Sequence, residues 1–289
     1  MAQHGKWVEK TNSRGYTFQQ CDGKHVSLTE LKEKFPENCY LRKENIPCYP
    51  TYVFNVKKVC HVTERPGLDG ILSDRGFKGK DDFLWWGLSV TDDDIVNAEK
   101  RIQLPISDKF TTSPAFLRES RYGNFCFSFN LNELLNLYSK QFCRRTSPIL
   151  RVLGTHLYRQ EIAYLVLVHP RHIRRYRKYP RLPIDEEFLC GYSQKKISWH
   201  CQSPSNEYNR HEEEKEKDDR SHGRPEYFVW DNVSVAFHMN PHWVLRVGHK
   251  RLFKSLSVCE VASRNLLKDQ EMSVHDAEKI VKYYKDKYN

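Results

Sequence analysis

The chain has 289 residues, of which 39% are hydrophobic and 13% aromatic, and its formal net charge at pH 7 is +10. This composition is rich enough in apolar residues to build a packed core, which excludes a wholly disordered chain. No stretch reaches the ~18–20 consecutive apolar residues of a membrane-spanning helix, so no membrane partner is expected. The positive charge predicts an anionic partner such as a nucleic acid (RNA or DNA), a nucleotide or an acidic protein.

The cysteines and the first residues of the chain indicate a reducing compartment. Nine cysteines are scattered without a C-x-x-C pair, a usage typical of reduced thiols in a cytoplasmic or nuclear protein. The first ten residues, MAQHGKWVEK, contain no apolar segment of a secretory signal. A zinc set can be drawn from Cys190, His200, Cys201 and His211, but its spacing matches no common zinc motif. No metal ion is therefore expected.

The first elements along the chain are a helix, a strand and a second helix. Residues 27–35, SLTELKEKF, begin with Ser27 three residues before a glutamate, the spacing of a capping box. Residues 52–62, YVFNVKKVCHV, are β-branched and aromatic and predict one strand. Residues 68–77, LDGILSDRGF, place apolar side chains on one helical face and end at Gly76, which is expected to cap the helix.

The middle of the chain predicts another strand–helix pair. Residues 81–104 begin as strand or loop and turn helical from about Asp93. In residues 121–142 a Tyr-Gly turn leads into an alternating strand, and Asn130 or Asn132 then caps a helix. The alternating phenylalanines of this strand are expected on its core face: Phe125, Phe127 and Phe129.

The second half of the chain is rich in strands. Residues 161–169, EIAYLVLVH, are apolar enough for a buried central strand, and a charged run at 202–225 predicts a flexible loop. The remaining elements are weaker strands within 186–201, strands at 226–237 and 242–247, and a C-terminal helix. This order predicts an α+β fold rather than regular βαβ units, and no dinucleotide or P-loop glycine motif is present.

Three motifs, taken in order, bear on function. The first is His61-x-Thr63 at a strand end, followed by GLDGILSDRGF; the second is RYGNFCFSF; the third is RPEYFVWDNVSVAF with NPHWVL close behind. Together they resemble the poly(ADP-ribose) polymerase-like branch of the ADP-ribosyltransferase fold. The resemblance implies a split mixed β-sheet over residues 51–250, with an N-terminal extension at 1–50 and a C-terminal helical extension at 251–289.

The resemblance also implies a site for NAD as substrate. The family's first strand ends in His-Gly-Thr. His61 corresponds to its histidine, which holds a ribose hydroxyl, Thr63 matches its threonine, and Val62 stands where the family has glycine. The family tyrosine falls on Cys126 or Phe127, depending on a one-residue gap. The residues expected to converge on one NAD cleft, together with His238 or His242, are His61, Thr63, Tyr122, Phe127 and Tyr138.

The catalytic glutamate of the family has no carboxylate counterpart here. Two alignments of the last motif place His242 or His238 at its position. Because the transferred sugar is oxocarbenium-like, a protonated histidine opposes the charge that a glutamate stabilises. A polymerase is therefore not expected. The resemblance leaves a weak mono-ADP-ribosyltransferase and an inactive relative as alternatives and, by analogy, suggests a role in innate immune or antiviral responses.

A different class of function rests on the basic run at 169–181, HPRHIRRYRKYPR. Clustered cations with interleaved aromatics can grip phosphates and stack on bases, although such a run is also typical of a solvated loop. The alternative function is thus a nucleic-acid-binding or regulatory interaction module without catalysis. The residues of this candidate interface are Arg171, Arg174, Arg175, Tyr176, Arg177, Lys178 and Arg181.

Overall fold

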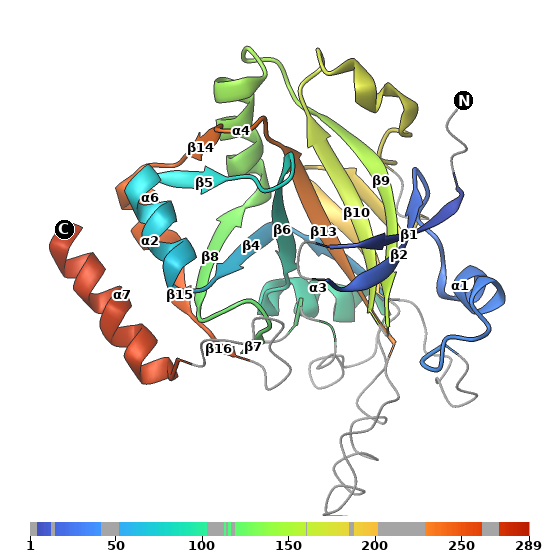
Figure 1. The fold of residues 1–289 in the computed structure, drawn as a ribbon, viewed down its shortest axis with the longest axis horizontal. Helices are drawn as coiled ribbons and strands as arrows, with labels where there is room; N and C mark the ends of the chain where they lie inside the picture. The colour runs from blue at the N-terminus through green and yellow to red at the C-terminus, as the bar shows by residue number, and fades with distance from the viewer. Residues whose placement is uncertain are drawn as a thin grey trace, which may run out of the picture.

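A computed structural model describes residues 5–12, 15–41, 52–102, 113, 115–116, 119–159, 161–184, 188–201, 229–261 and 272–288. Its main element is a nine-stranded mixed sheet (Figure 1). In spatial order the strands are β1 (Trp7–Thr11), β2 (Thr17–Asp22), β9 (Ile149–Tyr158), β10 (Glu161–His169), β13 (Trp230–His238), β6 (Phe83–Ser89), β4 (Lys58–Thr63), β8 (Phe125–Asn130) and β15 (Leu256–Val258).

One parallel pair lies at the centre of this sheet. β10 runs parallel to β13, and the other neighbouring strands described in the sheet are antiparallel. Both strands are almost continuously buried, as expected for a strand covered on two faces. Between them the chain passes through a short 3₁₀ helix (Arg174–Lys178) and two strands, β11 (Cys190–Ser193) and β12 (Lys196–Cys201).

The strand predicted at 52–62 is two strands in two sheets. β3 (Tyr52–Val56) pairs with β12 in a separate three-stranded sheet, whereas β4 joins the large sheet. The break comes at Lys57, where apolar alternation stops; its carbonyl accepts a hydrogen bond from Leu131 N at 2.8 Å. The prediction of a single strand is therefore wrong at this residue.

The described helices are α1 (Leu28–Lys34), α2 (Arg65–Asp74), α3 (Asp92–Ile102), α4 (Leu131–Phe142), α6 (His249–Ser255) and α7 (Val274–Tyr288). The sequence predicted each of these except α6, although α2 begins at Arg65 rather than at Leu68. Ser27 accepts from Glu30 N at 3.3 Å, which confirms the predicted cap. Asn130, rather than Asn132, caps α4 by accepting from Asn132 N at 3.0 Å.

The predicted C-cap of the second helix is wrong by one residue. Arg75 adopts the left-handed conformation (φ 55°) and its N–H bonds back to the last turn of α2. Gly76 instead begins β5 (Gly76–Lys78), which pairs with β14 (Val244–Arg246). A Cβ at Gly76 would lie 2.3 Å from the Leu245 carbonyl oxygen, so this glycine permits the close pairing of two strands.

The two faces of the large sheet are covered differently. On one, here called the helix face, Phe77 of β5 packs on Trp86 and Phe127, and Tyr138 of α4 packs on Phe237. The other, the loop face, carries a smaller apolar cluster that the 3₁₀ segment covers; its buried members are Leu153, Leu165, Leu167, Tyr176, Tyr179 and Ala236. Figure 1 shows the sheet between these layers, with α1 beside β1 and β2.

The mixed α+β class is confirmed. The strands predicted around residues 125–129, at 161–169 and at 226–237 correspond to β8, β10 and β13 of one sheet, although residues 226–228 lie outside the described residues. Strand β9 was not predicted. The expected boundaries at residues 50 and 250 do not separate the strands, because β1, β2 and β15 belong to the same sheet as the residues between. The expected loop at 202–225 lies outside the described residues. None of the described helices is long and apolar enough to cross a membrane.

A glycine joins two of the sequence motifs. Gly123 has φ +124°, and a Cβ there would lie 2.4 Å from the carbonyl oxygen of Thr63. We expect Gly123→Ala to lower the free energy of unfolding by more than about 2 kcal/mol, through backbone strain and overlap with a neighbouring backbone. Denaturant unfolding measures this loss.

The matched control is Gly70→Ala. Gly70 is exposed in α2, and nothing lies within 4 Å of the position of its Cβ. Alanine at such a helical site is expected to raise the free energy of unfolding by up to about 1 kcal/mol. Equal effects of the two substitutions would contradict the close packing of the Gly123 turn on Thr63.

Candidate functional site

The strand ends that carry the first and third motifs lie at the same edge of the sheet. β4 and β13 flank β6, and both run antiparallel to it. Cys60 of β4 and Ser234 of β13 both lie opposite Gly87. The two strands therefore run in the same direction, with Cys60 and Ser234 at the same level of the sheet. The order of the motifs therefore places His61 and His238 near one edge.

His61 lies in an aromatic environment on the helix face. Its ring centroid is 5.4 Å from those of Phe77 and Trp86, and Phe127 is its direct cross-strand neighbour. Nδ1 is 2.9 Å from the carbonyl oxygen of Trp85, which favours the tautomer with a proton on Nδ1. Burial lowers the pKa of His61, so the neutral imidazole is stabilised.

Thr63 is close to the turn of the second motif, as the Gly123 contact shows. Tyr122, the residue before that glycine, has 41% of its surface exposed, and its ring lies 5.7 Å from the Arg121 guanidinium. The structure thus brings together the backbones of Thr63 and Gly123.

Two aromatic rings that were expected to line the NAD cleft are in the core. Phe127 and Tyr138 are both fully buried, and the Tyr138 hydroxyl donates to the backbone carbonyl of His238 at 2.7 Å. Burial raises the pKa of Tyr138. In this conformation neither ring presents a face to a ligand, and the predicted core placement of Phe125, Phe127 and Phe129 is confirmed.

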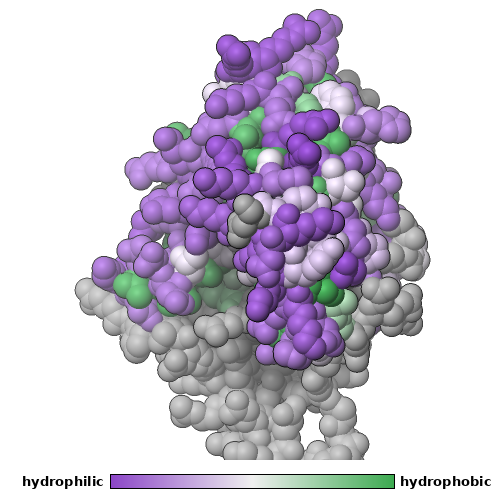
Figure 2. Space-filling model, turned by 90° about the vertical axis from the view of Figure 1, so that its left-hand side faces the viewer, coloured by the Kyte–Doolittle hydropathy of each residue, from purple (hydrophilic) through white to green (hydrophobic). Residues whose placement is uncertain are grey.

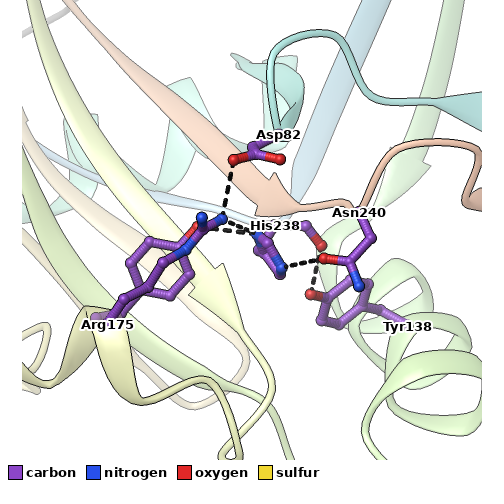
Figure 3. A network of polar contacts seen from close by, with 6 residues as sticks. Asp82, Tyr138, Arg175, His238 and Asn240 are labelled. Carbon is purple, nitrogen blue, oxygen red and sulfur yellow. Dashed lines mark hydrogen bonds and ion pairs between the residues drawn. The ribbon is translucent and has the colours of Figure 1, made fainter.

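His238 is the centre of a polar network on the loop face (Figure 3). Its Nδ1 lies 2.8 Å from the Tyr176 hydroxyl, and its Nε2 lies 3.0 Å from Asn240 Oδ1. Arg175 Nη2 donates to the Tyr176 hydroxyl at 2.7 Å and pairs with Asp82 at 3.0 Å. Burial and the nearby Arg175 charge lower the pKa of His238, which therefore accepts at Nδ1 as a neutral ring.

A second buried histidine, not selected from the sequence, lies beside the first. His169 ends β10 as His238 ends the parallel β13, and both rings contact Tyr176, at 5.0 and 5.3 Å between centroids. Arg151 Nε donates to His169 Nε2 at 2.9 Å. The signal was present in the sequence, because each histidine closes a long apolar strand, in EIAYLVLVH and NVSVAFH.

The expected single cleft is not formed. His61 faces Trp86, whose partner in β13 is Val235, so His61 and the odd-numbered positions of β13 share the helix face. His238 points from the opposite, loop face, as its contact with Tyr176 shows. His242, with φ 68°, lies in an exposed turn after β13. A glutamate in place of His238 would therefore project away from His61.

The basic run forms a rim beyond the carboxyl end of β10. All six of its basic residues are exposed, whereas Tyr176 and Tyr179 are buried, so the expectation that Tyr176 stacks on bases is wrong. The tyrosines instead fasten the segment to the loop face, and Arg151 Nη1 donates to the Tyr179 carbonyl at 2.6 Å. We call the six residues the basic edge: Arg171, Arg174, Arg175, Arg177, Lys178 and Arg181.

No group of three or more histidine, cysteine, aspartate and glutamate side chains in the described part of the chain is placed to hold a metal ion. His211 of the zinc set drawn from the sequence lies outside that part. Comparison of the chain with protein-family models, with curated proteins and with solved structures finds no match in any of the three. Function must therefore be argued from the geometry.

The buried histidines predict acid sensitivity. The pKa values of His25, His156 and His169 are each lowered to about 4, chiefly by burial. Between pH 6.5 and 4 the unfolded chain binds protons that the folded chain does not, so the free energy of unfolding decreases as pH falls through this window. Each such histidine contributes a slope of up to about 1.4 kcal/mol per pH unit.

We expect His169→Gln to reduce this slope by about one proton, since the glutamine amide keeps an acceptor for Arg151 but does not titrate. Denaturant unfolding at pH 4.5, 5.5 and 6.5 measures the slope. His275→Gln, at an exposed position in α7, is the control. An unchanged slope in His169→Gln would show that His169 is not held neutral.

Proposed function

We propose that this chain is a non-catalytic, ADP-ribosyltransferase-like binding protein that holds an anionic polymer, RNA or DNA, on its basic edge. The observation that carries the proposal is the anchoring of the segment 170–182. Its basic side chains face solvent, while its tyrosines and backbone are fixed to the loop face.

The backbone of this segment is held at several points. Val152 N donates to the Pro180 carbonyl and Leu182 N to the Leu150 carbonyl, each at 3.0 Å, so the end of the segment pairs with β9 like a short strand. A fixed backbone lowers the entropy lost when the exposed cations engage phosphates. This distinguishes the basic edge from an unanchored charged loop.

Further cations lie at the same edge of the sheet. Arg144 and Arg145 are exposed in the turn between α4 and β9, and His169 at the end of β10 is the register partner of Ile149 at the start of β9. Of the six basic-edge residues, Arg175 is paired with Asp82. A surface of this kind contacts phosphates rather than base edges, so affinity with little sequence preference is expected.

The placement of the NAD residues favours binding over catalysis. The ring of His61 is packed among aromatic side chains, Phe127 and Tyr138 are buried, and His238 faces the other side of the sheet. A transferase needs its ribose-binding group and its charge-stabilising group on one cleft.

The nucleic-acid prediction concerns Arg174→Ala/Arg177→Ala. Loss of two phosphate contacts is expected to weaken binding of single-stranded RNA and to reduce the slope of log K against log salt by about 1.4–1.8. Fluorescence anisotropy at several salt concentrations measures both. Lys282→Ala/Lys287→Ala, two exposed lysines of α7, is the control of equal charge. Parent-like affinity and slope in the arginine variant would overturn the proposal.

The NAD prediction is a negative result with a positive control. Calorimetric titration with NAD is expected to give no saturable heat, and incubation to release no nicotinamide, with an active ADP-ribosyltransferase assayed in parallel. Saturable binding that His61→Ala weakens by about one hydrogen bond, ~1–2 kcal/mol, would instead support an NAD site and contradict the non-catalytic part of the proposal.

A further inference from the structure

A polar cavity of about 400 Å³ lies between α3 and the three-stranded sheet formed by β11, β12 and β3. Its walls are β3, the start of β12, the β3–β4 junction, the last residue of β8 and the length of α3. We propose that this cavity binds a small anion dense in phosphate groups and free of an aromatic base.

The charge of the lining is predominantly positive. Of the lining residues that the structure describes, five are basic and two are aspartates; the basic residues are Lys57, Lys58, Lys100, Arg101 and Lys196. Among the described residues, none of the four lysines makes an ion pair. Phosphate groups would supply the missing counter-charge.

The cations converge because three separate segments meet at the end of β3. Lys57 and Lys58 follow directly on Val56, whose register partner is Ile197, so Lys196 of β12 lies beside them. Arg101 approaches the same strand from the last turn of α3. These residues come from parts of the chain about 40 to 140 positions apart, which is why the sequence alone did not suggest the site.

Arg101 is held in position by hydrogen bonds that lead through Asn55 to the buried Ser198. The Asn55 amide lies between Ser198 Oγ, at 3.0 Å, and the Arg101 guanidinium. With its oxygen turned to the arginine, it accepts from Nη2 at 2.9 Å and Nη1 at 3.1 Å. A guanidinium fixed in this way is already oriented to donate to a phosphate group, whose oxygens match the planar arrangement of the arginine N–H donors.

The two aspartates, Asp93 and Asp94, lie at the other end of α3, and Asp94 has a local function. Asp94 accepts from Thr91 N at 2.9 Å and from Thr91 Oγ1 at 2.7 Å, which closes the first turn of the helix. Asp94 is also buried. The negative charge is therefore partly used within the protein, and the basic end of the cavity faces the ligand.

The remaining lining selects the class of anion. Among the described residues it contains three asparagine side chains and one threonine, and only Val53 and Ala98 are apolar. None of these described lining residues is aromatic, so they offer a nucleobase no stacking partner. Such a lining suits a polyphosphate or a phosphorylated polyol better than a nucleotide.

This cavity is separate from the basic edge. Lys58 begins β4 and Asn130 ends β8, at the edge of the sheet opposite the carboxyl ends of β4, β10 and β13. The inference does not depend on binding of nucleic acid, and variants of the two regions test them independently.

Titration calorimetry of the full chain with inositol hexakisphosphate and with tripolyphosphate tests the proposal, and AMP serves as the base-containing probe. We expect both phosphate-dense probes to bind with one saturable site and AMP to bind at least tenfold more weakly. Lys58→Gln/Lys100→Gln should weaken the phosphate-dense probes at least tenfold. Arg174→Ala/Arg177→Ala should leave their affinity unchanged.

The control of equal charge is Lys282→Gln/Lys287→Gln, which should bind like the parent chain. Thermal unfolding without ligand checks that each variant is folded, and Lys196→Gln replaces the double variant if that variant unfolds. Absence of saturable binding, equal binding by the cavity variant, or tighter binding of AMP would each overturn the proposal. If Arg174→Ala/Arg177→Ala alone lowered the affinity for the phosphate-dense probes, the anion would bind at the basic edge, and the proposal would be overturned as well.

Discussion

The parallel pairing of β10 with β13 is the constraint on which the rest of the molecule depends. Because parallel neighbours cannot be joined by a hairpin, the chain must leave one edge of the sheet at His169 and return to the other edge at Trp230. That crossing carries the basic edge and the hairpin β11–β12. The hairpin in turn pairs with β3 and builds one wall of the polar cavity.

The ionisable groups at both ends of this parallel pair are bonded within the protein, whereas the buried indole nitrogen of Trp230 has no hydrogen-bond partner among the described residues. At the start, Arg121 forms a two-bond ion pair with Glu161, at 2.7 and 2.9 Å, and Asn232 donates to the same carboxylate. Burial by itself would raise the pKa of Glu161, but the Arg121 charge and these hydrogen bonds outweigh burial. The pKa of Glu161 is therefore lowered. At the other end, His169 and His238 are bonded as neutral rings. Such groups stabilise the strand ends and position the basic edge, a role that does not require them to touch a substrate.

Local structure could be predicted from the sequence because its signals are local. Ser27 and Asn130 cap their helices, and the alternation of Phe125, Phe127 and Phe129 gave both the strand and its buried face. The failures are non-local. Nothing near Lys57 indicates that β3 pairs with a strand some 140 residues later, and β9 contains polar residues that its neighbours bury. Arg151 is 8% exposed, and its buried guanidinium donates hydrogen bonds to His169 and to the Tyr179 carbonyl, two partners that are distant in the sequence.

In the candidate NAD site the ends of the strands lie together, but the side chains that were expected to act together do not. The order of the motifs brings the ends of β4 and β13 to one edge, but the side-chain period of two decides which face each residue occupies. On the helix face, the residue of β13 nearest its end is Phe237, one position before His238. Phe237 is fully buried and packed by Tyr138 at 5.2 Å between centroids. A charged side chain of β13 could act beside His61 only from this face of the sheet, and here the position is part of the core. For His238 to occupy the position of Phe237, the register of β13 would have to shift by one residue. That shift would turn every apolar side chain of β13 away from its packing partners.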